Sequence, residues 1–196
     1  FLCMMEYQKV PVTICFNKCD LVSGEEKEKL WQIYAPAGYD ILFTSVKTGE
    51  NIDNLKALLA DKTTTVAGPS GVGKSSLINE LQTGVRMQTG AISDKIGRGK
   101  HTTRHSEIIS IGQDTYIMDT PGFSSMDLPG FEKEDLWTCY PEFRQFEPNC
   151  RFQGCSHISE PDCGVKEALQ EGRISQIRYD NYVLLYEELK NKPKKY

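Results

Sequence analysis

The feature that most constrains this chain is the segment Gly68-Pro-Ser-Gly-Val-Gly-Lys-Ser75, which fits the phosphate-binding loop pattern G-x-x-x-x-G-K-[ST]. Glycines that precede a helix allow successive backbone N–H groups to point inward around a polyphosphate. Lys74 can then reach the β- and γ-phosphates, and the Ser75 hydroxyl can hold Mg²⁺. The segment therefore predicts an α/β fold in which a strand, a loop and a helix form a nucleotide phosphate site.

A second motif, Asn17-Lys-Cys-Asp20, fits the guanine-binding pattern N-K-x-D and lies upstream of the phosphate loop. In ordinary small GTPases the phosphate loop comes first and N-K-x-D follows it. The inverted order predicts that the domain is circularly permuted, with a mixed, mostly parallel sheet.

Two further segments follow expected strands. Asp119-Thr-Pro-Gly122 comes after the apolar run 116–118, and Ser45-Val-Lys47 comes after the run 41–43. Ligands of open α/β sheets bind at the carboxyl ends of strands, so all four motifs are expected at one rim. A phosphate loop alone also occurs in ATPases or by chance, and N-K-x-D alone fits any surface turn. Their combination predicts a guanine nucleotide.

Hydrophobic periodicity predicts the elements around these motifs. Ser23 is expected to cap an amphipathic helix, and Asn51 to cap another whose apolar face holds Ile52, Leu55, Leu58 and Leu59. The polar, glycine-containing segment 83–105 is expected to be a loop, at the position of a first switch. Strands are expected at 10–16 (buried and parallel), 40–44 and 63–67, with an antiparallel hairpin at 106–111 and 115–118, and helices at 75–81, 164–169 and 175–189.

The composition changes after Gly122, so we expect a GTPase domain at 1–130 and a small, mostly helical domain at 131–196. The second part contains the cluster Cys150-x4-Cys155-x-His157-x5-Cys163. Three sulfurs and one imidazole are the ligands of a closed, structural Zn²⁺ site, which would stabilise a domain with little core. Disulfides and a catalytic or redox cysteine are the alternatives. His101 and His105 lie apart from this cluster.

The bulk properties restrict partners and compartment. Net charge is −4, and no apolar stretch is long enough to cross a bilayer. Cys3, Cys15, Cys19 and Cys139 are expected to be reduced apolar fillers in a cytoplasmic protein. The basic segment 95–104 could contact either phosphates or RNA, and the tail 190–195 is expected to be solvated. Because the chain begins at Phe1 without a leader pattern or an initiator Met, we expect the natural protein to begin upstream.

The run N-K-C-D, T-S-V-K-T-G, G-P-S-G-V-G-K-S-S-L-I-N, G-K-H-T-T-R, D-T-P-G-F and C-x4-C-x-H-x-x-E-P-x-C resembles the RsgA (YjeQ) family of circularly permuted GTPases. The resemblance extends from Val10 to about Leu189. It implies a GTPase that acts late in assembly of the small (30S) ribosomal subunit and is stimulated by that subunit. An amino-terminal OB-fold domain, expected to precede Phe1, is not part of this chain.

The resemblance also implies residue roles. Asn17 and Asp20 would read the guanine edge, with Lys18 and Lys47 along the base and the backbone at Ser45 and Val46 facing the guanine carbonyl. The phosphates would be wrapped by a continuous stretch of the loop and the start of its helix: Ser70, Gly71, Val72, Gly73, Lys74, Ser75 and Ser76. Ser75, Asp119 and Thr103 would hold Mg²⁺, Thr103 (or Thr102) would close over the γ-phosphate, and the Gly122 amide would bind that phosphate.

Catalysis is expected to be slow without a partner. Phe123 stands where Ras-like enzymes place a water-orienting glutamine, and its ring cannot hydrogen-bond water. Within the chain, the candidate catalytic residues are His101, Thr103 and Lys74, and His101 is the one that could accept a proton from the attacking water. A catalytic group supplied by RNA or a partner is the alternative. The cofactors would be GTP/GDP, Mg²⁺ and one structural Zn²⁺.

The resemblance makes the small subunit and its rRNA the expected partners of a monomer. A zinc-stapled RNA or protein interaction module, in which nucleotide binding only sets conformation, is the second hypothesis. An ATP-dependent kinase or transporter ATPase is the third, but it leaves Asn17 and Asp20 without a role.

Overall fold

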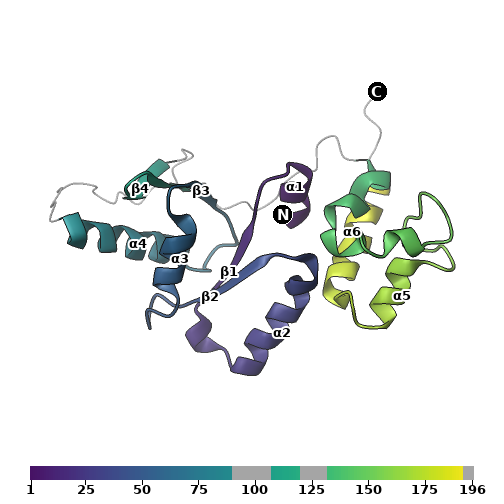
Figure 1. Ribbon diagram of the computed structural model, residues 1–196, viewed down its shortest axis with the longest axis horizontal. Coiled ribbons are helices and arrows are strands. Elements are labelled where there is room, and N and C mark those ends of the chain that lie inside the picture. Colours follow the sequence, from purple (N-terminus) through teal and green to yellow (C-terminus); the bar gives the residue numbers. More distant parts are fainter. Residues whose placement is uncertain (90–106, 120–131, 192–196) are drawn as a thin grey trace. The chain divides into compact units, whose positions relative to one another are not determined.

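The computed structural model of the protein describes residues 1–89, 107–119 and 132–191 (Figure 1). The chain forms two compact units. Unit 1 comprises Phe1–Ile14, Ser23–Ile41 and Asp127–Tyr196, and unit 2 comprises Cys15–Val22 and Leu42–Met126. The domain boundary expected near residue 130 lies outside the described residues and stays a prediction.

Unit 2 holds a mixed three-stranded sheet. Its order is β3 (Thr63–Val66), β5 (Thr115–Asp119) and β4 (Glu107–Gly112). β3 and β5 are parallel, and β4 and β5 are antiparallel with a register shift between Ser110 and Gly112. The predicted hairpin is confirmed, and its turn places Asp114 at a positive φ of 50°.

Helices α3 (Ile52–Leu59) and α4 (Lys74–Thr89) supply the core of unit 2 together with the sheet. Ile52, Leu55 and Leu59 are buried as predicted, but Leu58 is 36% exposed and lies off that face. Asn51 occupies the cap position of α3, yet the prediction that its side chain caps the helix is wrong, because its amide donates to the Phe43 carbonyl instead.

The expected loop from residue 83 is also wrong over its first part. Helix α4 continues to Thr89, about two turns beyond the predicted end at Leu81. Nothing between 82 and 89 breaks a helix strongly: the segment has no proline, and arginine, methionine and glutamine are residue types that favour a helix. Gly84 alone is too weak a breaker to end it.

Strands β1 (Thr13–Asn17) and β2 (Asp40–Thr44) form a separate two-stranded sheet in the described residues. β2 has the predicted bounds. β1 begins three residues later than predicted, after Pro11, which lacks a ladder donor. Its residues are exposed or half-buried, so the prediction of a buried strand is wrong.

Unit 1 is mostly helical, with α1 (Leu2–Tyr7), α2 (Gly24–Tyr34), α5 (Gly164–Gln170) and α6 (Gln176–Asn191). The predicted Ser23 cap is confirmed as a reciprocal capping box with Glu26. Short 3₁₀ turns connect these helices at Ala35–Ala37 (η2), Lys133–Cys139 (η3), Pro141–Phe143 (η4) and Glu147–Asn149 (η5).

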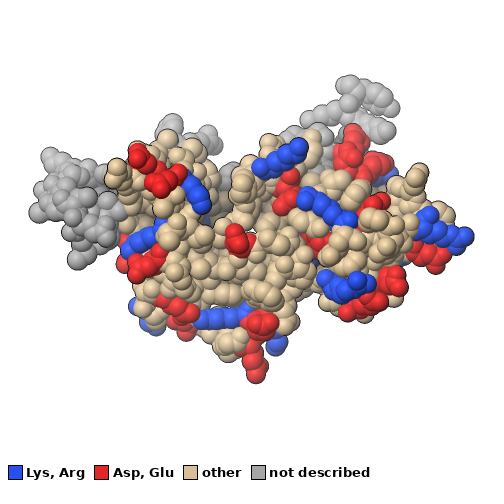
Figure 2. Space-filling view, in the orientation of Figure 1, with Lys and Arg blue, Asp and Glu red and all other residues tan. Residues whose placement is uncertain are grey.

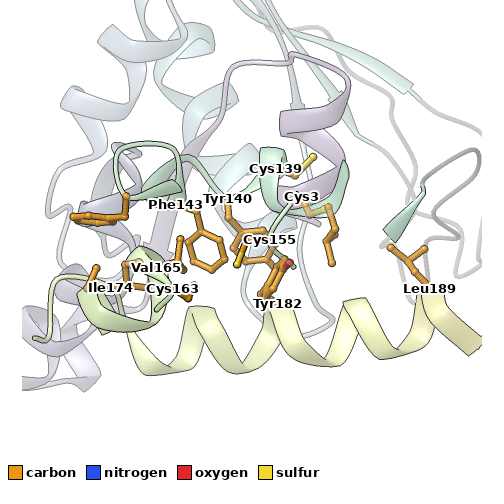
Figure 3. Close-up of a cluster of buried hydrophobic side chains, with 13 residues drawn as sticks. Cys3, Cys139, Tyr140, Phe143, Cys155, Cys163, Val165, Ile174, Tyr182 and Leu189 are labelled. Atoms are coloured by element: carbon orange, nitrogen blue, oxygen red, sulfur yellow. The ribbon is translucent and has the colours of Figure 1, made fainter. Parts of the chain in front are cut away.

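The core of unit 1 packs against one side of α6 (Figure 3). Tyr140, Phe143 and Tyr182 have ring centroids 5.0–5.2 Å apart. A buried ion pair lies beside them, in which Arg178 donates to both carboxylate oxygens of Glu142 at 2.7 and 3.0 Å.

Charges of both signs are interspersed on the face in view, without an extended basic patch among the described residues (Figure 2). None of the described helices combines the length and the apolar character that crossing a bilayer requires.

Candidate nucleotide site and zinc centre

The guanine motif and the phosphate loop meet within unit 2, although more than fifty residues separate them. The Asn17 side-chain amide donates to the Val72 carbonyl at 3.0 Å. The Lys18 ammonium donates to the Gly71 carbonyl at 2.7 Å. Lys18 has a left-handed φ of 64°, which turns the chain sharply at the end of β1. The two halves of a nucleotide site are therefore adjacent despite their inverted order.

The backbone of the phosphate loop requires glycine. Gly71 and Gly73 have φ values of 82° and 94°, which side chains rarely adopt. At Gly73 an added Cβ would also lie 2.5 Å from the Asn17 amide nitrogen. This position therefore needs glycine both for its own conformation and for the approach of the guanine motif.

The loop leads directly into helix α4, which begins at Lys74. The Lys74 ammonium donates to the Gly68 and Pro69 carbonyls at 2.6 and 2.8 Å, so it lies across the loop. Ser75 and Ser76 are exposed on the first turn, while Leu77 and Ile78 anchor the helix in the core. Exposed N–H groups, a lysine and hydroxyls at a helix N-terminus are the donors that a polyphosphate requires.

Asp20 is held by residues of the second guanine segment. Its carboxylate accepts from the buried Ser45 hydroxyl at 2.7 Å, and Lys47 lies 3.7 Å away. The hydrogen bond from Ser45 is the main cause that lowers the pKa of Asp20. The Ser45 hydroxyl also accepts from the Thr48 backbone N–H at 3.2 Å. Val46 follows Ser45 in the chain and packs on the unit 2 core.

The remaining nucleotide-site residues are only partly visible. The backbone of Asp119 ends strand β5 and is the register partner of Val66, at the end of β3 that leads into the loop. His101, Thr102, Thr103, Gly122 and Phe123 lie outside the described residues, as does the basic segment 95–104.

The four predicted zinc ligands converge in unit 1. Their ligand atoms all lie within 4.8 Å of one another. The Cys150 and Cys163 sulfurs are 3.8 Å apart, and His157 Nδ1 lies 3.6 and 3.4 Å from those two sulfurs. A tetrahedral Zn²⁺ with ordinary bond lengths gives sulfur–sulfur and sulfur–nitrogen edges of about 3.8 and 3.6 Å. A disulfide needs sulfurs about 2 Å apart. The cluster therefore fits a closed zinc site.

The environment of the cluster favours a cation. Burial lowers the pKa of His157 to about 4, so the imidazole is neutral and can ligate. Burial is also the main cause that raises the pKa of Cys155 to about 12. Thiolates in such surroundings need a bound cation to be stable.

The chain belongs to the RsgA GTPase family. The family profile described as RsgA GTPase matches residues 1–129. A relative from Agathobacter rectalis, named small ribosomal subunit biogenesis GTPase RsgA, is 74% identical over 194 residues, which are 99% of this chain and 64% of the relative. A relative of the same name from Clostridium botulinum is 48% identical over 195 residues, covering 100% of this chain and 66% of its own length. The chain thus spans about two thirds of these relatives.

Two solved structures are similar to this one. YjeQ from Thermotoga maritima has a TM-score of 0.77 at 36% identity, over 98% of this chain and 65% of that protein. YloQ, described as a circularly permuted GTPase, has a TM-score of 0.74 at 32% identity, over 100% of this chain and 63% of that one. The circularly permuted GTPase fold expected from the motif order is confirmed.

The structure adds residues to this RsgA-family zinc centre that the motifs did not identify. Glu160 lies within the quoted pattern without a predicted role. Its carboxylate accepts from the backbone N–H groups of Ser156, Ile158 and Ser159 and from the Ser156 hydroxyl. Burial opposes the effect, but these donors lower the pKa of Glu160 to about 2. The carboxylate therefore fixes the loop between Cys155 and Cys163.

Helix α6 also contacts this loop. Tyr182 donates its hydroxyl to the Ser156 carbonyl, and Tyr179 donates to the His157 carbonyl, both at 2.6 Å. The rings of Trp137 and Phe143 meet the His157 imidazole edge-on at 6.0 and 5.8 Å. The tyrosines lie 22 and 26 residues after the residues that they contact, so no pattern along the chain indicated these contacts.

Proposed function

We propose that this chain is the nucleotide-hydrolysing and zinc-bearing part of a GTPase that acts in late maturation of the small (30S) ribosomal subunit, where the subunit stimulates conversion of GTP to GDP and phosphate. The contact of Asn17 and Lys18 with Val72 and Gly71 carries the proposal, because it joins a guanine motif to a phosphate loop. The names of the relatives support the ribosomal role. Family membership does not favour the alternative interaction module.

Each half of the site has a chemical task. The Asp20 carboxylate, whose pKa is lowered, stays ionised and accepts from the ring N–H and exocyclic amine of guanine, which adenine does not offer. Asn17 and Lys18 would bind the guanine base and also contact the phosphate loop. The backbone at Ser45 and Val46, together with Lys47, would complete the binding site for the base. Because Asp20 is positioned by the Ser45 hydroxyl, it needs little reorganisation on binding.

The phosphate half neutralises and orients the nucleotide. Ser70 to Ser76 present backbone N–H groups at the start of α4, and Lys74 exchanges its loop carbonyls for the β- and γ-phosphates. Mg²⁺ would be held by Ser75, Asp119 and Thr103, and its charge would stabilise the developing phosphate charge. Gly122 and Thr103 would contact the γ-phosphate and so order their loops. Loss of the γ-phosphate would remove these contacts and release the loops.

The proposal extends to the parts of the chain that the structure does not describe. His101 is the proposed group that orients the attacking water, aided by ribosomal docking. The division into a GTPase domain at 1–130 and a zinc domain at 131–196 is supported by the end of the family match at residue 129. We further propose that the protein is a cytoplasmic monomer that contacts rRNA of the small subunit.

The test is GTP turnover by this chain with and without 30S particles. Slow turnover alone and strong activation by the particles are expected. Ser75→Ala should abolish the activated rate, because it removes a Mg²⁺ ligand. Ser110→Ala is the matched control, since its hydroxyl only donates to Gly112 within the β4–β5 hairpin. Equal turnover with and without particles would contradict the proposal.

A further inference from the structure

One guanidinium in unit 1 joins separate segments of the chain. Arg178 of helix α6 is 7% exposed and donates to both carboxylate oxygens of Glu142 in η4. Its Cζ also lies over three tyrosine rings, at 4.8 Å from the centroid of Tyr140, 5.7 Å from that of Tyr39 and 5.9 Å from that of Tyr34. A cation over an aromatic face is attracted to it, and more strongly where water is excluded. These five residues, all in unit 1, form the Arg178 cluster.

Two of the rings come from the segment between the two guanine motifs. Tyr34 ends helix α2, and Tyr39 is the residue before strand β2. Helix α2 also packs on α6, and η2 packs on η4. Arg178 therefore holds the beginning of β2 on the zinc-bearing part of the chain.

Strand β2 leads from the Arg178 cluster into the proposed guanine site. Its last residue, Thr44, is buried, and its hydroxyl donates to Oδ1 of Asn17 at 3.3 Å. Ser45, the next residue, donates to the Asp20 carboxylate. Loosening the beginning of β2 would therefore disturb the two hydroxyls that position the guanine motif.

Helix α6 also carries the residues that hold the zinc loop. Tyr179, next to Arg178, donates to the His157 carbonyl. Tyr182 donates to the Ser156 carbonyl. Coupling between two sites requires an element whose state both sites affect. Helix α6 meets this requirement, because it contacts the zinc loop through its tyrosines and the beginning of β2 through Arg178.

We propose that Arg178 is a positioning residue that couples the zinc centre to the guanine site. A zinc-bound α6 is ordered, and its Arg178 holds Tyr34 and Tyr39, which supports β2 at its beginning. Loss of zinc or of Arg178 removes this support, so that guanine nucleotides bind less tightly. Coupling is reciprocal, so GDP must raise the affinity for zinc by the factor by which zinc raises the affinity for GDP. The inference rests on the proposed guanine site.

The first test measures GDP affinity of the zinc-loaded chain with a fluorescent GDP analogue. Arg178→Met combined with Glu142→Leu removes both charges together, so no buried charge is left unpaired. This double variant should bind GDP about 5-fold or more weakly than the wild type. Arg173→Met is the matched control, because its guanidinium lies over the Phe146 ring at 4.6 Å, within the zinc-bearing part. It should bind GDP as the wild type does.

A second pair of variants leaves the ion pair intact. Tyr39→Phe keeps an aromatic face under the cation and should keep the wild-type affinity for GDP. Tyr39→Leu removes that face and should weaken GDP binding. This pair keeps the proposal testable if thermal unfolding shows that the double variant folds poorly.

The coupling itself is measured as zinc affinity, by competition with a chelator, with and without saturating GDP. In the wild type GDP should raise the zinc affinity by about 5-fold or more, and in the double variant by less than about 2-fold. A merely structural role of Arg178 would lower both affinities and leave this factor unchanged.

Three outcomes would overturn the proposal. One is an equal effect of GDP on zinc affinity in the wild type and the double variant. Another is equal GDP affinity of the double variant and Arg173→Met. The third is equal GDP affinity of Tyr39→Leu and Tyr39→Phe. A wild-type chain that binds GDP and ADP equally would instead count against the guanine site, so the two failures can be told apart.

Discussion

Replacing Gly73 with alanine should weaken nucleotide binding through two separate free-energy costs in the phosphate loop. The first is backbone strain, because an alanine at φ 94° costs about 1–2 kcal/mol. The second is a clash, because the new Cβ would lie 2.5 Å from the Asn17 amide nitrogen. Moving Asn17 also breaks its hydrogen bond to Val72, worth about 0.5–1.5 kcal/mol.

Gly71→Ala is the matched control. Its φ of 82° imposes similar strain, but nothing lies within 4 Å of its added Cβ. The loop is at the surface, so each variant can relax to another conformation that nucleotide binding must reverse. We therefore expect GDP affinity to fall by roughly 5- to 30-fold in Gly71→Ala, and by about 10- to 300-fold in Gly73→Ala.

The assay is titration of a fluorescent GDP analogue, with thermal unfolding measured in parallel to identify misfolded variants. The decisive quantity is the difference in GDP affinity between the two variants. If Gly73→Ala and Gly71→Ala lose the same GDP affinity, the contact between Asn17 and the phosphate loop does not contribute to nucleotide binding. That result would refute the predicted second cost.

Three other predictions concern the rest of the molecule. Removing zinc with a chelator should unfold the helical part of unit 1, seen as loss of helical circular dichroism that returns with added Zn²⁺; retained structure would contradict a structural site. Arg178→Met should destabilise the fold by about 3–5 kcal/mol in denaturant titration, because it leaves the buried Glu142 carboxylate unpaired, and adding Glu142→Leu should recover most of the loss. Ser45→Ala should raise the pKa of Asp20 in an NMR titration. Since the folded-state pKa is lowered, the contribution of Asp20 to stability is present at neutral pH and is lost as the pH falls below about 4; an unchanged pKa would refute the role of Ser45.

The features that could be predicted are those whose chemistry is local. The loop glycines, the Ser23–Glu26 capping box and the Cys/His spacing act within a few residues, so the sequence alone indicates them. Motif order added one long-range prediction, the meeting of Asn17 with the phosphate loop, because ligand chemistry requires both halves at one nucleotide.

The missed features depend on tertiary partners. Tyr182 and Ser156 are 26 residues apart, and Arg178 and Glu142 are 36 apart, so no pattern along the chain connects them. Asn51 carries the residue type of a cap, but the nearby Phe43 carbonyl attracts its amide instead. Helix α4 continued past its predicted end because weak local preferences did not oppose it.

The most direct test of the central claim is a comparison of GDP and ADP affinity for this chain by calorimetry. Charge-assisted hydrogen bonds from guanine to Asp20 are together worth about 3 kcal/mol, so GDP should bind roughly 100-fold tighter than ADP. Asp20→Asn should remove most of that preference, and Asp53→Asn, the same change on an exposed carboxylate of α3, should leave it intact. Equal binding of GDP and ADP, or a preference that survives Asp20→Asn, would contradict a guanine site built from the two inverted motifs.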